Sequence, residues 1–548
     1  MQTELMGILF ERGFEVVAAL CVMLASLYYI HMLQLESYQG KMYLRWLFKR
    51  FWAEMLQFLL VGLIALLLRA SYVFFVNTNE LIASICYIGA DVVYVGMLLM
   101  MFFTARRGKP KKPLVFTGRI MRLCVTLCVL AFLFTAHFFV AVRYTETLTW
   151  AQYLLPNVIR YLPGSIVPLF VMIAYIMIYP IEAAVKRWYF NDAKKKLASR
   201  KDIVKIGITG SFGKTSTKYA LGTILSEKYN VLFTQGSFNT PMGVTRVIRE
   251  QLKDEHQVFI AEMGARYKYD IKELCDLVRP GYGIITSIGK QHLETFGSME
   301  GIINAKYELI EALPDEGCCF FNADNEYCRQ MYEKTTLADK HMFGNECGLY
   351  MSVSNITADK NGSSFTLTAQ DGVVIPCESR LLGKHNIDNI AAAAACAYRM
   401  GLAPEQIAEG IKKINPVEHR LQLIEGAVTV IDDAFNANPV GSAEALEILK
   451  LFDGRRIVVT PGMVELGAEE AELNREFGRH MADCADIAIL VGKAHIQPIR
   501  AGLLEAGFDE KCIIQTATLS EASEKLPLFT EHGSVVLFEN DLPDNYNE

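Results

Sequence analysis

The sequence lacks the features that mark disulfide-stabilised, zinc-binding and nucleic-acid-binding proteins. Its 13 cysteines are scattered and none forms a Cys-x-x-Cys pair, so we interpret them as reduced thiols packed as small hydrophobic side chains. Basic residues are not in excess, since the formal net charge is −6 and the isoelectric point about 6.0. This balance argues against a nucleic acid as partner.

Apolar residues, in contrast, are in excess and unevenly placed. Hydrophobic residues make up 52% of the 548 positions and the mean hydropathy is +0.22, with the long apolar runs concentrated in residues 1–185. A helix needs ~20 residues to cross ~30 Å of hydrocarbon. The first run lacks the basic region and the cleavage site of a signal peptide. We predict five membrane spans, at 13–33, 53–76, 81–104, 122–142 and 162–184.

The charge of the loops alternates. Basic residues are frequent between the first and second span, between the third and fourth, and after the fifth, whereas 77–80 has none and 143–161 has only Arg143 and Arg160. The positive-inside rule then predicts an integral plasma-membrane protein with an outside N-terminus and a cytoplasmic C-terminal part. The prolines of "YLPGSIVP" (161–168) predict a kink at the start of the fifth span.

Three ionisable residues, Glu54, Arg69 and Asp91, fall within or near the spans. A charged group in lipid is costly, so it marks either a polar site for a headgroup or substrate, or a side chain that snorkels to the interface or joins an intramembrane ion pair. The sequence leaves both interpretations open.

A phosphate-binding loop is predicted at "GITGSFGKTST" (207–217), between a β-branched run at 202–210 and a predicted helix at 214–229. In such a loop, backbone N–H groups and the helix N-terminus hold phosphate oxygens. The strict motif lacks its first glycine, because Ile208 stands in that position. A plain turn is therefore the alternative.

Within this loop we expect Lys214 to reach the β- and γ-phosphates of ATP and the Thr215 hydroxyl to ligate Mg²⁺. Glycines in the turn let the backbone approach the nucleotide closely. The other candidate contacts are Gly210, Ser211, Gly213 and Ser216.

Further candidates follow two later strands. The apolar run "HQVFIAEMGA" (256–265) ends in Glu262, and a carboxylate at a strand end beside a phosphate loop is where a Mg²⁺ ligand belongs. A third strand in "PGYGIITSIGKQHLETFGS" (280–298) is followed by His292, and the next predicted helix carries Lys306. Taken alone, Lys306 is better explained as a surface lysine paired with the neighbouring glutamates at 308 and 311.

From residue 203 onward, the chain resembles the Mur ligase family, most closely the MurF branch of UDP-N-acetylmuramoyl-tripeptide:D-alanyl-D-alanine ligases. Each motif alone is weak, but ten in the family's order are specific. The motifs are "TGSFGKTST", "SFNTPMGV", "AEMGA", "SIGKQHLETFGS", "NAKYELI", "FNADN", "GKHNIDNIAAAAA", "EHR", "DDAFNANP" and "GMVELG".

The resemblance implies an ATP-dependent ligase that joins a carboxylate to an amine through an acyl phosphate. It also implies that Thr215 and Glu262 hold one Mg²⁺ ion, that His292 holds a second, and that Lys306 takes up CO₂ to become a carbamate that helps to hold the metal. A lysine must be neutral, and hence buried, for that reaction.

The same resemblance assigns nucleotide and substrate contacts. Asn386 is expected to face adenine, Arg420 to span the phosphates, and Asp433 to face the ribose or the arginine. A turn cap is the alternative for each asparagine. The expected substrate residues are Asn239, at the carboxylate, and Asn436 and Asn438, beside the amine.

The implied fold is an α-helical membrane region followed by an α/β central ATPase domain and a Rossmann-like C-terminal domain. We expect the active site in the cleft between the two Mur ligase domains, which would close on ligand. The predicted boundaries are 1–185 for the membrane region, 186–202 for a basic linker, 203–415 for the central domain and 416–548 for the C-terminal domain.

Two departures from the family pattern bear on the substrates. The membrane region stands where a MurF ligase has the domain that grips UDP-MurNAc, and Glu539, Asn540 and Asp541 replace the usual Lys-Gly-Ser turn after the last strand. We expect a carboxylate-bearing cell-wall precursor, UDP- or lipid-linked, and an amino acid or dipeptide amine, with membrane lipids as partners. A ligase for a polyglutamate-like polymer, an ATP-driven exporter and a non-catalytic scaffold are the alternatives.

Overall fold

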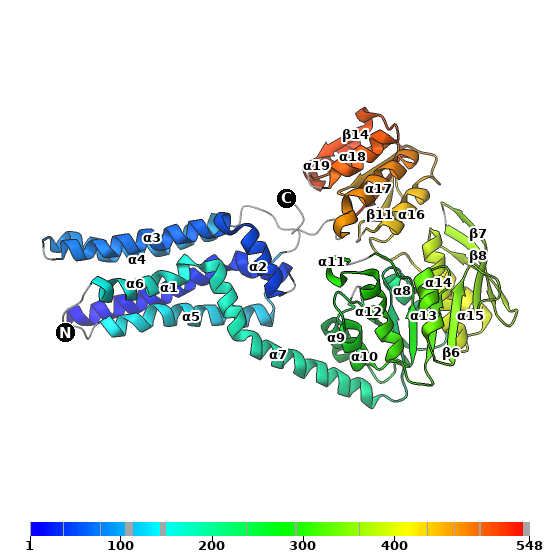
Figure 1. Cartoon of the computed structure of the whole chain (residues 1–548), viewed down its shortest axis with the longest axis horizontal. Coiled ribbons are helices and arrows are strands. Elements are labelled where there is room, and N and C mark those ends of the chain that lie inside the picture. Colours follow the sequence, from blue (N-terminus) through cyan, green and yellow to red (C-terminus); the bar gives the residue numbers. More distant parts are fainter. Residues whose placement is uncertain are drawn as a thin grey trace. The chain divides into compact units, whose positions relative to one another are not determined.

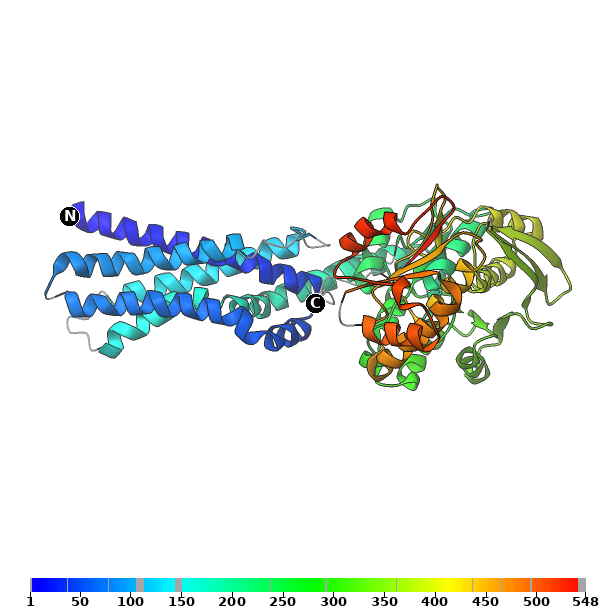
Figure 2. The same cartoon turned by 90° about the horizontal axis from the view of Figure 1, so that it is seen from above.

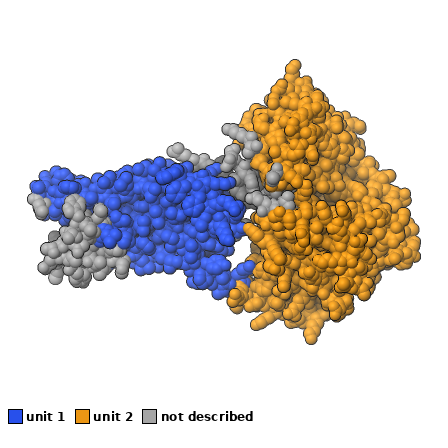
Figure 3. Space-filling model, in the orientation of Figure 1, with its two compact units in different colours: residues 1–186 blue, residues 187–548 orange. Residues whose placement is uncertain are grey.

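The computed structural model divides the chain into two compact units, residues 1–186 and 187–548 (Figures 1 and 3). Unit 1 is helical, and the described strands all lie in unit 2, in two sheets. The structure describes residues 2–36, 38–76, 78–104, 113–142, 150–236, 238–290, 293–360, 362–435, 437–464, 466–492 and 495–540.

Unit 1 is a bundle of long helices that run side by side (Figure 2). Large apolar side chains on the outside of the bundle, such as Leu67 and Ile85, are more than half exposed, and a lipid environment would cover them. Five of the described helices (α1, α3, α4, α5 and α7) are long and apolar enough to cross a membrane, as predicted. The helices are α1 (Gln2–Leu35), α2 (Gly40–Lys49), α3 (Phe51–Phe75), α4 (Glu80–Thr104), α5 (Gly118–Val142), α6 (Trp150–Ser165) and α7 (Val167–Ser199).

The approach to the fifth span differs from the prediction. The segment 143–161 was predicted as a loop, but its described part lies on α6. A break at Ile166 separates α6 from α7, which confirms the predicted kink in 161–168. Arg160 is therefore not a loop charge, because it sits on α6 with only 3% of its surface exposed.

Arg160 belongs to a buried polar network with the charged residues of two spans. Its Nη2 lies 3.1 Å from Asp91 Oδ2, and Arg69 Nη1 lies 3.6 Å from the same oxygen. The Tyr161 hydroxyl donates to Asp91 Oδ1 at 2.7 Å, and Arg69 Nε donates to Asn157 Oδ1 at 3.1 Å. Of the two interpretations for Arg69 and Asp91, the structure favours the intramembrane ion pair.

The first sheet of unit 2 has nine strands in the order β2-β3-β1-β4-β5-β6-β7-β8-β9. Neighbours from β2 to β7 pair in parallel, and β8 and β9 add antiparallel. The carboxyl ends of β3, β1 and β4 therefore lie at one edge, where doubly wound sheets bind ligands. The strands are β1 (Val204–Thr209), β2 (Val231–Phe233), β3 (Val258–Glu262), β4 (Tyr282–Ile285), β5 (Cys318–Asn322), β6 (Asp339–Gly344), β7 (Met351–Asp359), β8 (Gly362–Ala369) and β9 (Val374–Ser379).

Helices cover both faces of this sheet and enclose two apolar cores. The core on one face includes α8, α14 and α15, and α14 packs closely on α8 through its run of buried alanines, Ala391–Ala395. The core on the other face includes α9, α10, α12 and α13. The helices are α8 (Lys214–Leu225), α9 (Pro241–Gln251), α10 (Asp270–Val278), α11 (Leu293–Phe296), α12 (Met299–Glu311), α13 (Glu326–Lys334), α14 (Lys384–Arg399) and α15 (Pro404–Lys412).

The second sheet is mixed, with the order β10-β11-β15-β12-β13-β14. The strands from β11 to β15 pair in parallel, as expected of a Rossmann-like domain, and a short antiparallel β10 adds to the edge. The strands are β10 (Gln422–Ile424), β11 (Thr429–Asp433), β12 (Arg456–Thr460), β13 (Ile487–Val491), β14 (Ile513–Thr516) and β15 (Val535–Glu539). The helices are α16 (Pro439–Leu449), α17 (Glu470–Cys484), α18 (Ile496–Glu505) and α19 (Leu519–Lys525).

The segment 186–202, predicted as a linker, is helical as far as the end of α7. Ala193 and Leu197 of this helix are buried in the core that α9 also joins. On the surface, Arg249 of α9 pairs with Asp192 at 2.6 Å and lies 4.1 Å from the ring centroid of Tyr189. The end of α7 is thus part of the core of unit 2.

The buried network around Asp91 generates a prediction for the stability of unit 1. Asp91→Asn keeps the size of the side chain but removes the negative charge that faces two buried guanidiniums, which we expect to cost about 3 kcal/mol or more. Thermal unfolding of the detergent-solubilised chain measures this loss. Glu80→Gln is the control, because Glu80 is exposed at the start of the same helix. Equal unfolding midpoints for the two variants would contradict the role of the network.

Candidate functional site

The predicted phosphate loop joins β1 to the N-terminus of α8. Gly213 has φ +79°, and a Cβ at this position would lie 2.2 Å from Asn389 Oδ1, so the turn requires glycine. The loop is fixed from the side by Ser211, whose hydroxyl donates to the Gly289 carbonyl at 3.0 Å. The free N–H groups at the start of α8 are thereby presented at the carboxyl edge of the sheet, as an anion site needs.

Lys214 lies over this loop. Its Nζ donates to the carbonyl oxygens of Gly210 and Ser211, each at 2.8 Å. Burial lowers the pKa of Lys214 to about 8, with Glu262 opposing the shift and Arg420 adding to it. The amine is therefore held beside the turn, where the oxygens of a bound phosphate would replace the carbonyls as its acceptors.

Glu262, at the end of β3, is the centre of the site and is only 1% exposed. Its carboxylate accepts hydrogen bonds from Thr215 Oγ1 at 3.1 and 3.0 Å, from Lys218 Nζ at 3.0 Å and from Asn239 Nδ2 at 3.1 Å. Burial acts to raise the pKa of Glu262, but Lys218 and Lys214 outweigh it and the pKa is lowered. The carboxylate is thus ionised, and Lys218 and Lys214 balance its negative charge.

Lys218 was not among the predicted site residues. It follows Lys214 by four positions on α8, so the two amines share a helix face. Its side chain is fully buried, and it donates to the Gly236 carbonyl as well as to Glu262. The signal in the sequence was a second lysine one turn into a predicted helix, which by itself reads as an ordinary exposed residue.

Lys306 lies on α12 and is 2% exposed. Burial lowers the pKa of Lys306 well below its ordinary value, and the nearby Lys214 adds to this shift, against the effect of Asp270 and Glu308. The surface-lysine interpretation is therefore wrong. The burial that carbamate formation requires is present.

Arg420 sits in a loop of unusual backbone geometry, because the residues on both sides of it, His419 and Leu421, have φ of +60° and +46°. Such conformations are retained where surrounding contacts enforce them. One such contact is the N–H of Leu421, which donates to Asp433 Oδ1 at 3.1 Å. Burial lowers the pKa of Arg420 and Glu262 opposes the shift, so the guanidinium lies within the electrostatic reach of the carboxylate that centres the site.

The start of α14 lies beside the phosphate loop. Asn386 is 5% exposed and its Nδ2 donates to the Leu382 carbonyl at 2.8 Å. Asn389, one turn further along, was not predicted, yet its Oδ1 accepts from Thr217 at 3.1 Å and borders Gly213. Asn389 thus contacts the loop directly.

Of the remaining predicted residues, two lie in the described part of the chain and two lie outside it. Asn438 caps α16, because its Oδ1 accepts from the Gly441 N–H at 3.0 Å, which is the turn-cap alternative. Ser216 lies in the first turn of α8. His292 and Asn436 lie outside the described residues.

The residues around Glu262 fit a magnesium ion. Mg²⁺ takes oxygen ligands, and the Thr215 hydroxyl and both carboxylate oxygens of Glu262 converge within hydrogen-bond distance at the strand end. Lys306 brings no oxygen in its amine form, so it fits as a ligand only after it has become a carbamate.

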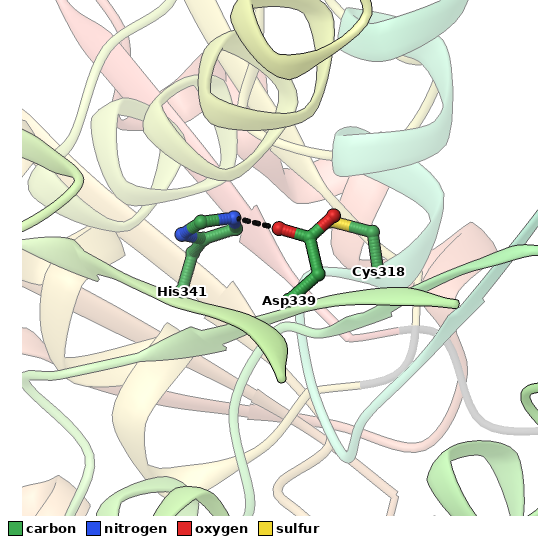
Figure 4. A group of neighbouring side chains, drawn as sticks. All are labelled: Cys318, Asp339 and His341. Atoms are coloured by element: carbon green, nitrogen blue, oxygen red, sulfur yellow. Dashed lines mark hydrogen bonds and ion pairs between the residues drawn. The ribbon is translucent and has the colours of Figure 1, made fainter. Parts of the chain in front are cut away.

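A separate polar cluster lies at the opposite edge of the sheet, where Cys318 and Asp339 begin β5 and β6 (Figure 4). The ligand atoms of Cys318, Asp339 and His341 lie within 4.8 Å of one another, a spacing that a metal could use. However, Arg399 Nη2 lies 2.8 Å from Asp339 and already balances its charge, while burial raises the pKa of the Cys318 thiol. We therefore assign the group to an ion-pair network.

Family models match both sheet-containing parts of unit 2. The profile of the Mur ligase middle domain matches residues 208–397, and that of the Mur ligase, glutamate ligase domain matches residues 419–539. Two relatives named UDP-N-acetylmuramoyl-tripeptide--D-alanyl-D-alanine ligase are each 31% identical. The Bacillus subtilis protein aligns over 278 residues, or 50% of this chain and 59% of its own length. The Escherichia coli protein aligns over 338 residues, or 60% and 74%.

The solved structure of MurF from Acinetobacter baumannii superposes with a TM-score of 0.59 at 26% identity, over 65% of this chain and 77% of that one. The chain spans between about three fifths and three quarters of the two curated relatives' lengths. Both catalytic domains are matched in order, and the phosphate loop and the Glu262 cluster lie within the first of them. This chain belongs to the Mur ligase family.

Proposed function

We propose that this chain is a MurF-like ligase that uses ATP to join a carboxylate to an amine in peptidoglycan precursor synthesis at the membrane. The observation that carries the proposal is the buried Glu262 carboxylate, which is hydrogen-bonded to the Thr215 hydroxyl. Its negative charge also acts on Lys214 and on Arg420. This arrangement stands at the carboxyl edge of the sheet in the region that matches the Mur ligase middle domain, and the relatives that align with this chain are named UDP-N-acetylmuramoyl-tripeptide--D-alanyl-D-alanine ligase.

The reaction has two steps. An oxygen of the substrate carboxylate attacks the γ-phosphorus of ATP, the bond to the β-phosphate oxygen breaks, and an acyl phosphate and ADP form. The amine nitrogen then attacks the acyl carbon, the amine proton is lost, and phosphate leaves. The physical difficulty is to bring several anions together, so pre-placed cations and N–H donors carry the catalysis. Lys214, Arg420 and the turn at Gly213 supply them.

Magnesium would be held by Thr215 and Glu262 and, at a second position, by His292 and a carbamate on Lys306; bound there, it would neutralise charge on the phosphates. Among this chain's own residues, Asn386 and Asp433 are proposed to contact the nucleoside. Asn239, which already donates to Glu262, is proposed to face the carboxylate substrate, and the amine is proposed to bind beside Asn436 and Asn438.

We further propose that unit 1 crosses the plasma membrane with its N-terminus outside, so that unit 2 meets cytoplasmic ATP. The alternation of basic residues between the loops supports this orientation. The carboxylate substrate is proposed to be a muramoyl peptide, UDP- or lipid-linked, and the amine an amino acid or a dipeptide. The names of the relatives support the peptide, and the membrane unit supports access to lipid-linked precursors.

The proposed reaction predicts phosphate release from ATP only when both a carboxylate and an amine substrate are supplied. Lys214→Ala should lower this rate by about a hundredfold or more, because a cation aimed at the transferred phosphoryl group is lost. Lys228→Ala is the control, since Lys228 is exposed and outside the site. A coupled phosphate assay with full-length protein measures both variants. Full activity in Lys214→Ala would refute the site, and phosphate release without a new amide would favour a transporter.

The substrate itself can be identified in cells. Depletion of the protein should lead to accumulation of the muramoyl peptide that is its carboxylate substrate, because the consuming step is blocked. Mass spectrometry of the UDP-linked and lipid-linked precursor pools separates the two possible carriers. Unchanged muramoyl pools of both kinds would refute a role in peptidoglycan synthesis.

The burial of Lys306 predicts dependence on CO₂. The lowered pKa of Lys306 favours the neutral, reactive form of its amine, and activity should fall as the pH falls through that pKa, because protonation stops carbamate formation. Lys306→Gln should lose about a hundredfold in rate, while Lys306→Glu, which restores a carboxylate, should lose less. Carbon-13 NMR with labelled bicarbonate should show a carbamate signal in the wild type and none in Lys306→Gln. Its absence from the wild type would contradict the modification.

A further inference from the structure

Two acidic side chains meet at the carboxyl ends of neighbouring strands in the second sheet. Asp433 ends β11 and Glu539 ends β15, and the parallel register pairs these two residues directly. Register partners point to the same face of a sheet, so their side chains are neighbours. Glu539 is fully buried and Asp433 half-buried.

The hydrogen bonds around this pair leave one oxygen to be explained. The Ser442 hydroxyl donates to Glu539 Oε1 at 2.5 Å, and the Leu421 N–H donates to Asp433 Oδ1 at 3.1 Å. Among the described residues no donor reaches the buried Glu539 Oε2, while the two carboxyl groups are within hydrogen-bond range of each other. An ionised carboxylate only accepts, so two of them can be bonded only when one carries a proton.

The charges near the pair agree with this protonation. Arg420 is the cation that acts on Asp433, and the neighbouring Asp432, which is bonded to His419 at 2.7 Å, acts in the opposite direction. Burial raises the pKa of Glu539 well above its ordinary value, and Asp433 adds to the shift. One proton on the pair leaves a single negative charge facing a single guanidinium.

We propose that Glu539 is a positioning residue that stays protonated and donates to Asp433, and that Asp433 in turn holds the Arg420 loop through the Leu421 N–H. The loop needs such a hold, because its backbone is in the left-handed region on both sides of Arg420. The consequence for catalysis rests on the proposed ligase function, in which Arg420 contacts the nucleotide phosphates. The protonated pair itself does not depend on that function.

Infrared spectroscopy tests the protonation directly on the full-length protein. The wild type minus Glu539→Gln difference spectrum at neutral pH should show the C=O stretching band of a protonated carboxyl group. Glu531→Gln is the matched control, because Glu531 lies ahead of the same strand with its side chain 62% exposed, and its difference spectrum should lack the band. Absence of the band from the wild type minus Glu539→Gln spectrum would overturn the proposal.

Affinity for Mg-ATP, measured by calorimetry, tests the positioning role without requiring turnover. Glu539→Gln keeps a donor toward Asp433 and an acceptor for Ser442, so its affinity should stay within about twofold of the wild type. Glu539→Ala leaves Asp433 and Ser442 without their buried partner and should weaken binding roughly tenfold or more. Equal weakening in both variants, or none in either, would overturn the role. A wild type that binds Mg-ATP but ligates nothing would refute the proposed function and leave the pair standing.

Discussion

A buried carboxylate is stable only when other groups balance its charge, and the groups that balance Glu262 hold together the candidate site of unit 2. An unpaired buried charge of this kind would cost on the order of several kcal/mol. The partners come from two segments: α8 provides Thr215 and Lys218, and the loop before α9 provides Asn239. One ionised side chain at a strand end therefore ties the phosphate loop to the loop proposed to face the carboxylate substrate. The hydrogen bonds that stabilise the Glu262 carboxylate at the strand end also position the Glu262 and Thr215 oxygens that fit a magnesium ion.

The helical unit meets the same constraint with other residues. There Asp91 is balanced by Arg69 and Arg160 from two different helices, which fixes α6 against the bundle at the point where the chain turns into α7. Leu197, near the end of α7, is buried in the same core as residues of α9. The last part of α7 therefore contributes to the core of unit 2. Asn239 lies two residues before α9, so the core that contains Leu197 also supports the helix that follows the Asn239 loop.

Local patterns predicted most of this fold, and long-range packing accounts for what they did not. Apolar length gave the five spans, and strand–turn–helix order gave the loop around Lys214, because both are properties of contiguous residues. Arg160 was misplaced because its partner Asp91 lies 69 positions away in the chain. Lys218 was missed for the same reason, since only the fold brings its amine next to Glu262. Lys306 was ambiguous in sequence because burial of a lysine depends on the neighbours that tertiary structure supplies.

The second sheet shows how a departure from a family pattern can be absorbed. The resemblance leads one to expect a lysine turn after the last strand, and this chain has an acid there, beside another acid. An ionised glutamate at this point would repel Asp433 and loosen the loop that Asp433 clamps. A protonated glutamate instead acts as a donor, as a lysine would, but without adding a charge. The Asp433–Glu539 pair then keeps a single negative charge, and the charges of both Asp433 and Glu262 act on the Arg420 guanidinium.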